Sequence, residues 1–504
     1  MNFKEKLMSF FKRIKDWFVG LGKKIRHFVL KLFKKDTGEE EEKNSVSKHY
    51  LTGKEARAIA KANNKEMRRL EKAKRRKVAP AEYTTQMKDN GNILEIEDLH
   101  TFFFTDQGVV KAVNGVSFEV PMNSTVGVVG ESGCGKSVTS MSVMRLLQGP
   151  SGQIVSGSIR FKAIDFKKDA AGKLIPVYEY DDDGNIVYEQ TVDKKGRPVF
   201  DKEGKPVMAP KQKKDENGIG LYEKEEKVFD IAKMPMQAMY QLRGRQMSMV
   251  FKEPMTSLNP VFTIGNQLDE VTLIHVPDAT KEFAKKRSID MLNLVGIAMP
   301  ERVYASFPHE LSGGMRQRVM IAMALACEPR LIIADEPTTA LDVTIQAQIL
   351  ELINKLKAER NLSVIFITHD LGVVANMADK IAVMYAGKIV EYGTADDVFY
   401  NPRHPYTWAL LSSMPDLDTN EKLDAIPGTP PNMIYPPKGD AFAERNKYAL
   451  KIDFEQQPPM FKISDTHYAA TWLLHPDAPE VPIPKAITDR IARMKKLTGG
   501  EDGK

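Results

Sequence analysis

The feature that most constrains this chain is a glycine-rich loop between a short apolar run and a predicted helix. The apolar run, Val126 to Val129, is typical of a buried strand, and the loop after it fits the pattern G-x-x-x-x-G-K-[ST]. In such loops backbone N–H groups surround phosphate oxygens, while Lys136 reaches the β and γ phosphates and Ser137 offers its hydroxyl to Mg²⁺. The helix that begins at Lys136 directs the positive end of its dipole at the same phosphates. The predicted nucleotide-binding residues are Gly130, Glu131, Ser132, Gly133, Cys134, Gly135, Lys136, Ser137 and Val138.

A second apolar run, Leu331 to Ala334, ends in two carboxylates. Asp335 is suited to hold Mg²⁺, directly or through water, because hard cations take oxygen ligands. Glu336 can polarise the attacking water, which is the positioning role that phosphoryl transfer requires. Alone, this segment would be an ordinary strand with a solvated acidic end. Beside the glycine-rich loop, it predicts binding and hydrolysis of ATP with Mg²⁺ as cofactor.

Between these two segments lies a Ser-Gly-Gly turn, followed by a predicted helix from Val319 to Leu325. By itself such a turn is more often only a helix cap. In this order it resembles the signature motif of ATP-binding cassette (ABC) ATPases, through Leu311, Ser312, Gly313, Gly314 and Met315. The resemblance implies two cassettes facing head to tail, with each signature turn contacting the γ-phosphate on the other's glycine loop. Ser312 and the following amides at a helix N-terminus suit such an anion. Met315 replaces the usual glutamine, a departure shared by the peptide-transport branch.

Two further segments resemble elements of this family. Thr339 to Asp342 is similar to the D-loop, whose aspartate, here Asp342, touches the opposing site. His369 follows an apolar run and resembles the switch histidine that bonds the γ-phosphate. A lone histidine after a strand is usually structural, and the preceding motifs favour function here. Lys136, Glu336 and His369 are the predicted catalytic residues.

The family also places an aromatic residue on an early strand, where it stacks on adenine. This chain offers Phe102, Phe103 and Phe104. Alignment with the family favours Phe103. Because strand side chains alternate between faces, Phe102 and Phe104 are expected to share the opposite face and to lie in the core.

One residue departs from the family's pattern. Lys252 stands where a glutamine is expected to bind Mg²⁺ and to sense the membrane subunit. An ammonium cannot coordinate a metal ion and is repelled by it. Either Lys252 turns toward phosphate instead, or this site hydrolyses ATP slowly. The other groups are intact, so ATP binding is predicted in either case.

The composition excludes several classes of protein. Two cysteines among 504 residues cannot form a disulfide framework, which indicates a cytosolic protein. No apolar run approaches the roughly 18 residues needed to span a bilayer. Residues 1–35 carry eleven lysines and arginines against two acidic residues, so the remainder of the chain is slightly acidic. Nucleic-acid binding by the chain after residue 35 is therefore not expected.

The chain is longer than one cassette needs, and the extra length precedes and interrupts it. Residues 1–36 have apolar side chains on one helical face and basic ones opposite, which predicts a basic amphipathic helix. Such a helix suits an anionic membrane surface, and its alternatives are packing on a partner subunit or on this chain's own core. Residues 37–91 are predicted to be a solvated, charged linker with a helical stretch from Lys54 to Lys77. An insertion at about 165–237 repeats Asp-x-x-Gly five times, which predicts small β-hairpins of unknown role. It lacks the terminal glutamate of a calcium-binding loop.

The C-terminal part resembles the ATPases of oligopeptide and dipeptide importers, specifically the D-type subunit. The resemblance rests on the run from Asn401 to Leu411, the Ile-Pro-Gly-Thr-Pro-Pro run that begins at Ile426, and the segment Glu253 to Pro260. Tails of this family often carry cysteines that bind an iron–sulfur cluster. Thiolates are what such clusters require, so no cluster is predicted here. The corresponding positions are Asp440, Asn446 and Asp453.

We therefore expect an α/β fold with a P-loop (RecA-like) ABC ATPase core over residues 92–425. Its parts would be an antiparallel β subdomain, a helical signature subdomain and the β-hairpin insertion, followed by an extension over residues 426–504. The resemblance implies a peripheral protein at the cytoplasmic face of the cell membrane, which energises oligopeptide import. Its expected partners are two membrane permeases, a second ABC ATPase in a heterodimer and, indirectly, an extracellular peptide-binding protein. The alternatives are import of nickel or another small solute, or a cassette with a degenerate, slowly hydrolysing site.

The sequence argues against a soluble cassette protein, such as a translation factor or a chromosome-associated factor. Such proteins carry two cassettes in one chain or a long coiled coil. This chain has one glycine loop of this pattern and no long heptads.

Overall fold

The computed structural model describes residues 52–76, 78–193, 197–216, 218–338, 341–414 and 426–497. The chain divides into two units after Thr52, and all elements below belong to the second. The predicted amphipathic helix at residues 1–36 lies outside the described residues, as do Thr339 and Ala340 of the D-loop match.

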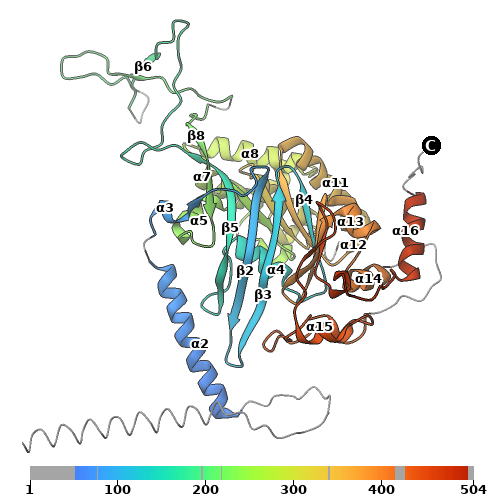
Figure 1. The fold of residues 1–504 in the computed structure, drawn as a ribbon. Helices are drawn as coiled ribbons and strands as arrows, with labels where there is room; N and C mark the ends of the chain where they lie inside the picture. The colour runs from blue at the N-terminus through green and yellow to red at the C-terminus, as the bar shows by residue number, and fades with distance from the viewer. Residues whose placement is uncertain are drawn as a thin grey trace, which may run out of the picture. The chain divides into compact units, whose positions relative to one another are not determined.

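An eight-stranded sheet forms the centre of the cassette, in the order β14-β15-β13-β12-β4-β11-β10-β9. Figure 1 labels one of its strands, β4. Within this sheet, the five adjacent strands β12, β4, β11, β10 and β9 pair in parallel. Every residue of β4, β10 and β11 is buried, as expected of parallel strands covered on both faces. This confirms the predicted parallel core. The strands are β4 (Thr125–Val129), β9 (Met247–Val250), β10 (Leu331–Asp335), β11 (Ser363–Thr368), β12 (Lys380–Tyr385), β13 (Lys388–Thr394), β14 (Phe461–Lys462) and β15 (Tyr468–Ala469).

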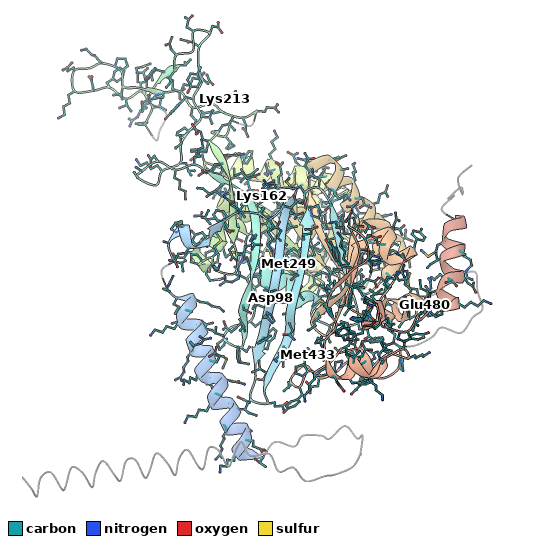
Figure 2. All side chains as sticks on the ribbon, in the orientation of Figure 1. Asp98, Lys162, Lys213, Met249, Met433 and Glu480 are labelled. Carbon is teal, nitrogen blue, oxygen red and sulfur yellow. The ribbon has the colours of Figure 1, made fainter. Side chains whose placement is uncertain are left out.

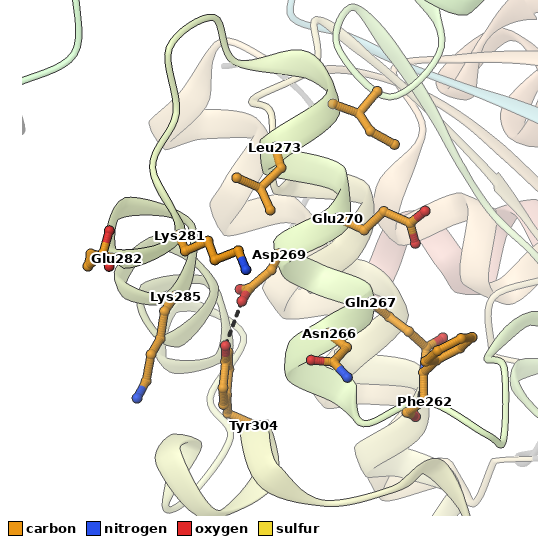
Figure 3. Close-up of a pocket in the computed structure, with 11 residues that line it drawn as sticks. Phe262, Asn266, Gln267, Asp269, Glu270, Leu273, Lys281, Glu282, Lys285 and Tyr304 are labelled. Atoms are coloured by element: carbon orange, nitrogen blue, oxygen red, sulfur yellow. Dashed lines mark hydrogen bonds between the residues drawn. The ribbon is translucent and has the colours of Figure 1, made fainter. Parts of the chain in front are cut away.

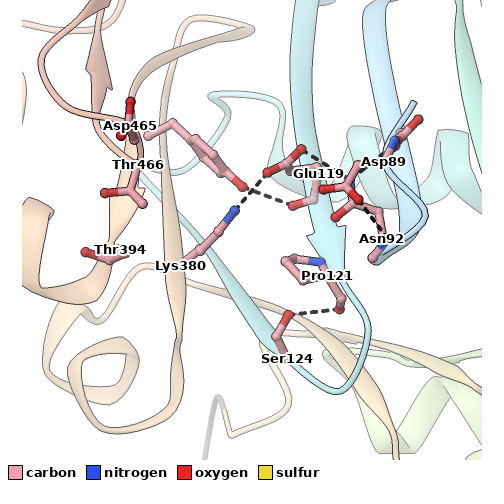
Figure 4. A network of polar contacts seen from close by, with 12 residues as sticks. Asp89, Asn92, Glu119, Pro121, Ser124, Lys380, Thr394, Asp465 and Thr466 are labelled. Atoms are coloured by element: carbon pink, nitrogen blue, oxygen red, sulfur yellow. Dashed lines mark hydrogen bonds and ion pairs between the residues drawn. The ribbon is translucent and has the colours of Figure 1, made fainter. Parts of the chain in front are cut away.

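A second, five-stranded antiparallel sheet has the order β1-β8-β5-β2-β3. Lys380 on β12 and Glu119 on β3 connect it to the central sheet, with 2.8 Å between Nζ and Oε1 (Figure 4). The hydroxyl of Tyr392 on β13 also donates to the backbone oxygen of Glu119, at 3.1 Å. The predicted antiparallel β subdomain is therefore present. Its strands are β1 (Thr84–Thr85), β2 (Asn92–Phe104), β3 (Val109–Pro121), β5 (Gly152–Phe166) and β8 (Lys224–Asp230).

Helices cover the central sheet and form the signature subdomain. Alternate residues of β10 and β11 belong to two different hydrophobic clusters, one on each face of the sheet. The cluster that contains Ile332 and Phe366 continues into α7, α8 and α10, so the subdomain shares its core with the sheet. The helices are α4 (Lys136–Val143), α5 (Met236–Leu242), α6 (Pro254–Ser257), α7 (Ile264–His275), α8 (Lys281–Leu294), α9 (Pro300–Ala305), η1 (Pro308–Glu310), α10 (Gly313–Leu325), α11 (Val343–Arg360) and α12 (Leu371–Met377).

The insertion extends from the ends of β5 and β8 and carries β6 (Tyr188–Gln190) and β7 (Met208–Pro210). It consists of short antiparallel pairings, as the Asp-x-x-Gly pattern predicts. In the turn at Asp169, the carboxylate accepts the amides of Ala171 and Lys173, and Gly172 has a φ of 79°. Figure 2 shows the insertion's side chains, Lys213 among them, spread away from the sheets. Within the described residues, no cluster of three metal-ligating side chains occurs there or elsewhere.

The segment predicted as a solvated linker makes more contacts than its charge suggests. Its basic stretch forms α2 (Gly53–Lys74), and buried Asn63 on α2 donates to the backbone oxygen of Thr105, at 2.7 Å. After α3 (Pro80–Tyr83), strand β1 pairs with β8, and Tyr83 packs on Phe229 with 5.9 Å between ring centres. The end of this segment is therefore part of the cassette, because its few apolar residues complete the β subdomain's core.

The C-terminal part packs against the carboxyl end of β12 through an aromatic cluster. Tyr385, Tyr406 and Phe442 have ring centres 4.6 to 5.3 Å apart and are almost fully buried. The cluster joins the extension to the cassette at the carboxyl end of β12. The elements are α13 (Ala395–Tyr400), α14 (Pro405–Ser412), η2 (Ala443–Arg445), α15 (Lys451–Glu455), η3 (Trp472–Leu474) and α16 (Lys485–Leu497).

Candidate nucleotide site

The glycine-rich loop runs from the end of β4 to the start of α4, as the sequence predicts. Two of its glycines are sterically required. Gly130 has a φ of 149°, and a Cβ there would lie 2.1 Å from the backbone oxygen of Met384. Gly135 has a φ of 107°, and a Cβ there would lie 2.4 Å from the backbone oxygen of Ala112. The loop is therefore held against the β subdomain and β12, and only glycine fits both contacts.

Lys136 lies inside the curve of this loop. Its Nζ donates to the backbone oxygens of Gly130, at 2.7 Å, and Glu131, at 3.0 Å, and the residue is only 5% exposed. Gly135, the N-cap of α4, has no side chain to occupy the first helical amides. The arrangement offers an ammonium and a helix N-terminus to the same anion, which fits phosphate.

Ser137 and Asp335 meet at the start of α4. The hydroxyl of Ser137 donates to Oδ1 of Asp335, at 2.9 Å. Burial raises the pKa of the Asp335 carboxyl, and the hydrogen bond from Ser137 opposes that shift. A hydroxyl and a buried carboxylate are oxygen ligands of the kind Mg²⁺ takes, so the donor set fits the predicted metal.

Glu336 follows at the end of β10, with a φ of 46°. Its carboxylate lies between two other predicted site residues. Lys252 Nζ is 2.8 Å from Oε2, and His369 Nδ1 is 3.5 Å from Oε1. The hydrogen bond that Lys252 donates to Glu336 is the largest cause of the raised pKa of the Lys252 ammonium. In the structure, the Lys252 ammonium therefore binds the carboxylate of Glu336, which is the group expected to polarise the attacking water.

The signature turn is the N-cap of α10. Ser312 accepts the amide of Met315 on its hydroxyl, at 3.3 Å, and both Ser312 and Gly313 are exposed. Leu311 is buried, and a Cβ on Gly314 would lie 3.1 Å from Ile345 of α11. The turn is thus fixed from behind and open in front, where another molecule can reach it.

Asp342 is the N-cap of α11, and its carboxylate accepts the amide of Ile345, at 3.0 Å. This contact fixes the end of the D-loop match relative to the signature turn, because Ile345 contacts both.

The three phenylalanines of β2 do not alternate as predicted. Phe104 is buried, but Phe102 and Phe103 are both half-buried. The pairing of β2 shifts between Thr101 and Phe103, which places both rings partly at the surface. Phe102 has Lys111 Nζ 6.0 Å from its ring centre and is not a core residue. Phe103 packs over Gly152, where a Cβ would lie 2.9 Å from its ring, and part of the side chain remains exposed.

Two contacts of the glycine loop come from residues that the sequence did not single out. The carboxylate of Glu131 pairs with Arg445 of the C-terminal extension, with Oε2 2.6 Å from Nη1 and Oε1 2.9 Å from Nη2. The amide of Glu131 donates to the hydroxyl of Tyr406, at 2.8 Å. No local signal could have found this pair, because Glu131 and Arg445 are 314 positions apart. The side chain of Glu131 therefore faces the extension.

Comparisons with known proteins agree with this geometry. The family described as the oligopeptide/dipeptide transporter C-terminal region matches residues 390–452. The ABC transporter family matches residues 113–182 and 211–339. Residues 183–210, between the two matched parts, belong to the insertion.

Three curated relatives illustrate the similarity. The oligopeptide transport ATP-binding protein OppD of Bacillus subtilis is 50% identical over 80% of this chain and 94% of its own length. The dipeptide transport ATP-binding protein DppD of Lactococcus lactis is 44% identical, over 81% and 98%. OppD of Mycoplasma genitalium is 38% identical, over 83% and 96%. Among solved structures, a dimeric ATP-binding cassette bound to ADP and phosphate is 20% identical, with a TM-score of 0.42, and covers 60% of this chain and 98% of its own.

Proposed function

Because this chain belongs to the family of ATP-binding subunits of oligopeptide and dipeptide ABC transporters, we propose that it energises oligopeptide import across the cytoplasmic membrane. The protein is an ABC ATPase. The observation that carries the proposal is the hydrogen bond from Ser137, the residue after Lys136, to Asp335, which ends β10 and precedes Glu336. Ligands of open α/β sheets bind at this edge.

The position of each residue suggests its part in hydrolysis. Lys136 would move its hydrogen bonds from the loop carbonyls to phosphate oxygens. Ser137 and Asp335 would hold Mg²⁺, which when bound neutralises charge on the β and γ phosphates. Glu336 would orient the attacking water as a hydrogen-bond acceptor, and His369 would donate to the γ-phosphate from its place beside that carboxylate.

The partner in catalysis is a second cassette, in a heterodimer. Exposed Ser312 and Gly313 would reach the γ-phosphate on the partner's loop, and the partner's signature turn would complete the site described here. Asp342, which caps α11 beside that turn, would touch the opposing site.

The surface for a membrane permease is proposed on the helical subdomain. Residues 255–260 precede exposed Val261 and Phe262, which are 74% and 51% exposed. A pocket of about 750 Å³ adjoins them between α7, α8 and α9 (Figure 3). Tyr304 donates to Asp269 in its wall, at 2.5 Å, and burial with this bond raises the Tyr304 pKa to about 12. A cytoplasmic helix of one permease would fit this mixed apolar and polar surface.

This docking would hold the protein at the cytoplasmic face of the membrane, with an extracellular peptide-binding protein as an indirect partner. None of the helices in the described ranges could itself cross a bilayer, by length and apolar character. The proposal includes no nucleic-acid partner.

The extension is proposed to fold without an iron–sulfur cluster. Asp440, Asn446 and Asp453 offer oxygens at the positions where the family's cysteines are expected. Each oxygen accepts a nearby backbone amide: that of Phe442 at 3.2 Å, Tyr448 at 2.9 Å and Leu450 at 2.6 Å. These side chains do not fit a cluster that needs thiolates. They instead close local turns.

The proposal is tested in the complex of this subunit with its permeases and partner cassette, reconstituted in liposomes. Uptake of a labelled oligopeptide should depend on ATP and should be lost in Glu336→Gln, while labelled ATP still binds. Uptake of nickel but not of peptides would favour the alternative solute. ATP-independent uptake would refute the proposal.

A second candidate, a slowly hydrolysing site, is favoured by one observation. Lys252 forms an ion pair with the carboxylate of Glu336, with 2.8 Å between Nζ and Oε2. In this form the subunit would bind ATP and close on its partner, and the partner's loop would carry most of the turnover.

A further inference from the structure

Resting on the proposed function, we propose that Arg445 is a positioning residue for the nucleotide site. It belongs to η2 of the C-terminal extension, yet it reaches the glycine-rich loop through Glu131. By this contact the extension holds the loop in the shape that receives ATP, so that nucleotide affinity depends on a segment outside the cassette core.

The contact between Arg445 and Glu131 is bidentate and largely shielded from water. Both terminal nitrogens of the guanidinium face both carboxylate oxygens, at 2.6 Å and 2.9 Å. The Arg445 side chain is 5% exposed and that of Glu131 is 26% exposed. Paired planar groups of this kind are strong and directional, so they define the position of the Glu131 side chain.

The guanidinium is itself held by two other segments. Its Nε donates to the backbone oxygen of Pro427, at 2.7 Å, and its Nη1 donates to the hydroxyl of Tyr385, at 3.0 Å. Its carbon also lies 5.6 Å from the ring centre of Tyr385. A group fixed at several points is a rigid support for the loop, because little conformational freedom remains to be lost when ATP binds.

The backbone of the same loop residue is fixed as well. The amide of Glu131 donates to the hydroxyl of Tyr406, whose ring packs on Tyr385 with 4.6 Å between centres. The carbonyl of Glu131 accepts from Lys136, at 3.0 Å. Glu131 is thus a loop residue through which both Arg445 and Tyr406 act on the lysine.

This arrangement matters when ATP arrives. Lys136 must then release the carbonyls of Gly130 and Glu131 to reach phosphate. The loop loses two internal hydrogen bonds at that moment, and it keeps its shape only if other contacts hold it. Arg445 and Tyr406 are such contacts, since neither depends on Lys136.

The test uses the full complex and 8-azido-ATP, with photolabelling read on this subunit alone after separation of the chains. Arg445→Gln should raise the concentration for half-maximal labelling about tenfold, and Glu131→Gln should do the same, as expected for loss of a charge-assisted contact. The double variant should be no weaker than either single one, because the two residues act through one contact.

Arg490→Gln is the matched control. Arg490 lies on α16 and donates to the backbone oxygens of Leu411 and Met414, at 2.7 Å and 3.0 Å, so it joins the extension to the end of α14. For Arg490→Gln, the concentration of 8-azido-ATP for half-maximal labelling should stay within about twofold of the parent's. Thermal unfolding is measured for each variant. If Arg445→Gln fails to fold, Arg445→Lys replaces it, which keeps the charge and loses the bidentate geometry.

Unchanged labelling of Arg445→Gln or Arg445→Lys would overturn the inference. Additive effects of the two single variants would overturn it too, as would equal weakening by Arg490→Gln, which would make the role one of general stability. Failure of the parent complex to be labelled would instead count against the proposed function.

Discussion

Replacement of Lys252 by glutamine is expected to raise the rate of ATP hydrolysis. In the structure, the Lys252 ammonium lies 2.8 Å from the carboxylate that would polarise water. This pair stabilises the state without attacking water, and it must loosen before Glu336 can orient one. Interactions that are stronger in the ground state than in the transition state slow the chemical step.

The size of the effect depends on the exposure of the pair. The Lys252 side chain is 49% exposed and that of Glu336 is 9% exposed. Water therefore screens the ammonium, and pairs of this kind contribute about 0.2–1 kcal/mol. Since each 1.36 kcal/mol is tenfold in rate, release of Glu336 alone should raise the rate about 1.4- to 5-fold. Glutamine also supplies an amide oxygen for Mg²⁺, so Lys252→Gln should be the faster variant.

The assay is steady-state phosphate release by the assembled complex at saturating ATP. Lys252→Met is the matched control, because it removes the charge and offers no oxygen ligand. A gain in both variants assigns the effect to the released carboxylate, and a gain in Lys252→Gln alone assigns it to the new ligand. No gain in either would refute the reasoning. A loss in both would favour the other alternative, in which Lys252 turns to phosphate.

Four further substitutions have definite expected outcomes. Gly135→Ala should abolish ATP binding, because the added Cβ would lie 2.4 Å from the backbone oxygen of Ala112. At Gly133 nothing lies within 4 Å of an added Cβ, so Gly133→Ala should cost only about 1–2 kcal/mol of stability, which comes from the positive φ. Photolabelling with 8-azido-ATP measures the first effect and thermal unfolding measures the second. Burial raises the pKa of Asp440 to about 6, so the folded state holds this proton more tightly and stability falls as pH rises from about 4 to 6. Asp440→Asn should therefore be more stable than the parent above pH 6, by up to about 3 kcal/mol, and equal to it near pH 4; an equal difference at both pH values in urea unfolding would contradict this. Phe103→Ala should weaken binding of ATP several-fold, by about 1–1.5 kcal/mol, and leave binding of inorganic triphosphate unchanged in competition labelling; equal loss for both would remove the stacking role.

Local patterns in the amino-acid sequence are sufficient to predict the parallel core and the order of its motifs. A glycine loop after an apolar run, and an apolar run that ends in Asp335 and Glu336, each specify a strand and the residues at its carboxyl end. Since parallel strands bring their carboxyl ends to one edge, the meeting of Ser137 and Asp335 at 2.9 Å is expected from those patterns. The Asp-x-x-Gly turns of the insertion are equally local, because each aspartate closes its own turn.

Contacts that depend on whole layers or on an irregular strand could be found only in the folded chain. The shift in β2 pairing, which brings Phe102 toward the surface, has no signature in a run of three phenylalanines. The partner of Lys252 depends on how β9 and β10 lie side by side. Arg445 meets Glu131 because the aromatic cluster seats the extension on the end of β12. Periodicity and turn chemistry encode the neighbours of a residue along the chain. A contact across 314 positions depends on the packing of every layer between them, and that information is spread over the whole sequence.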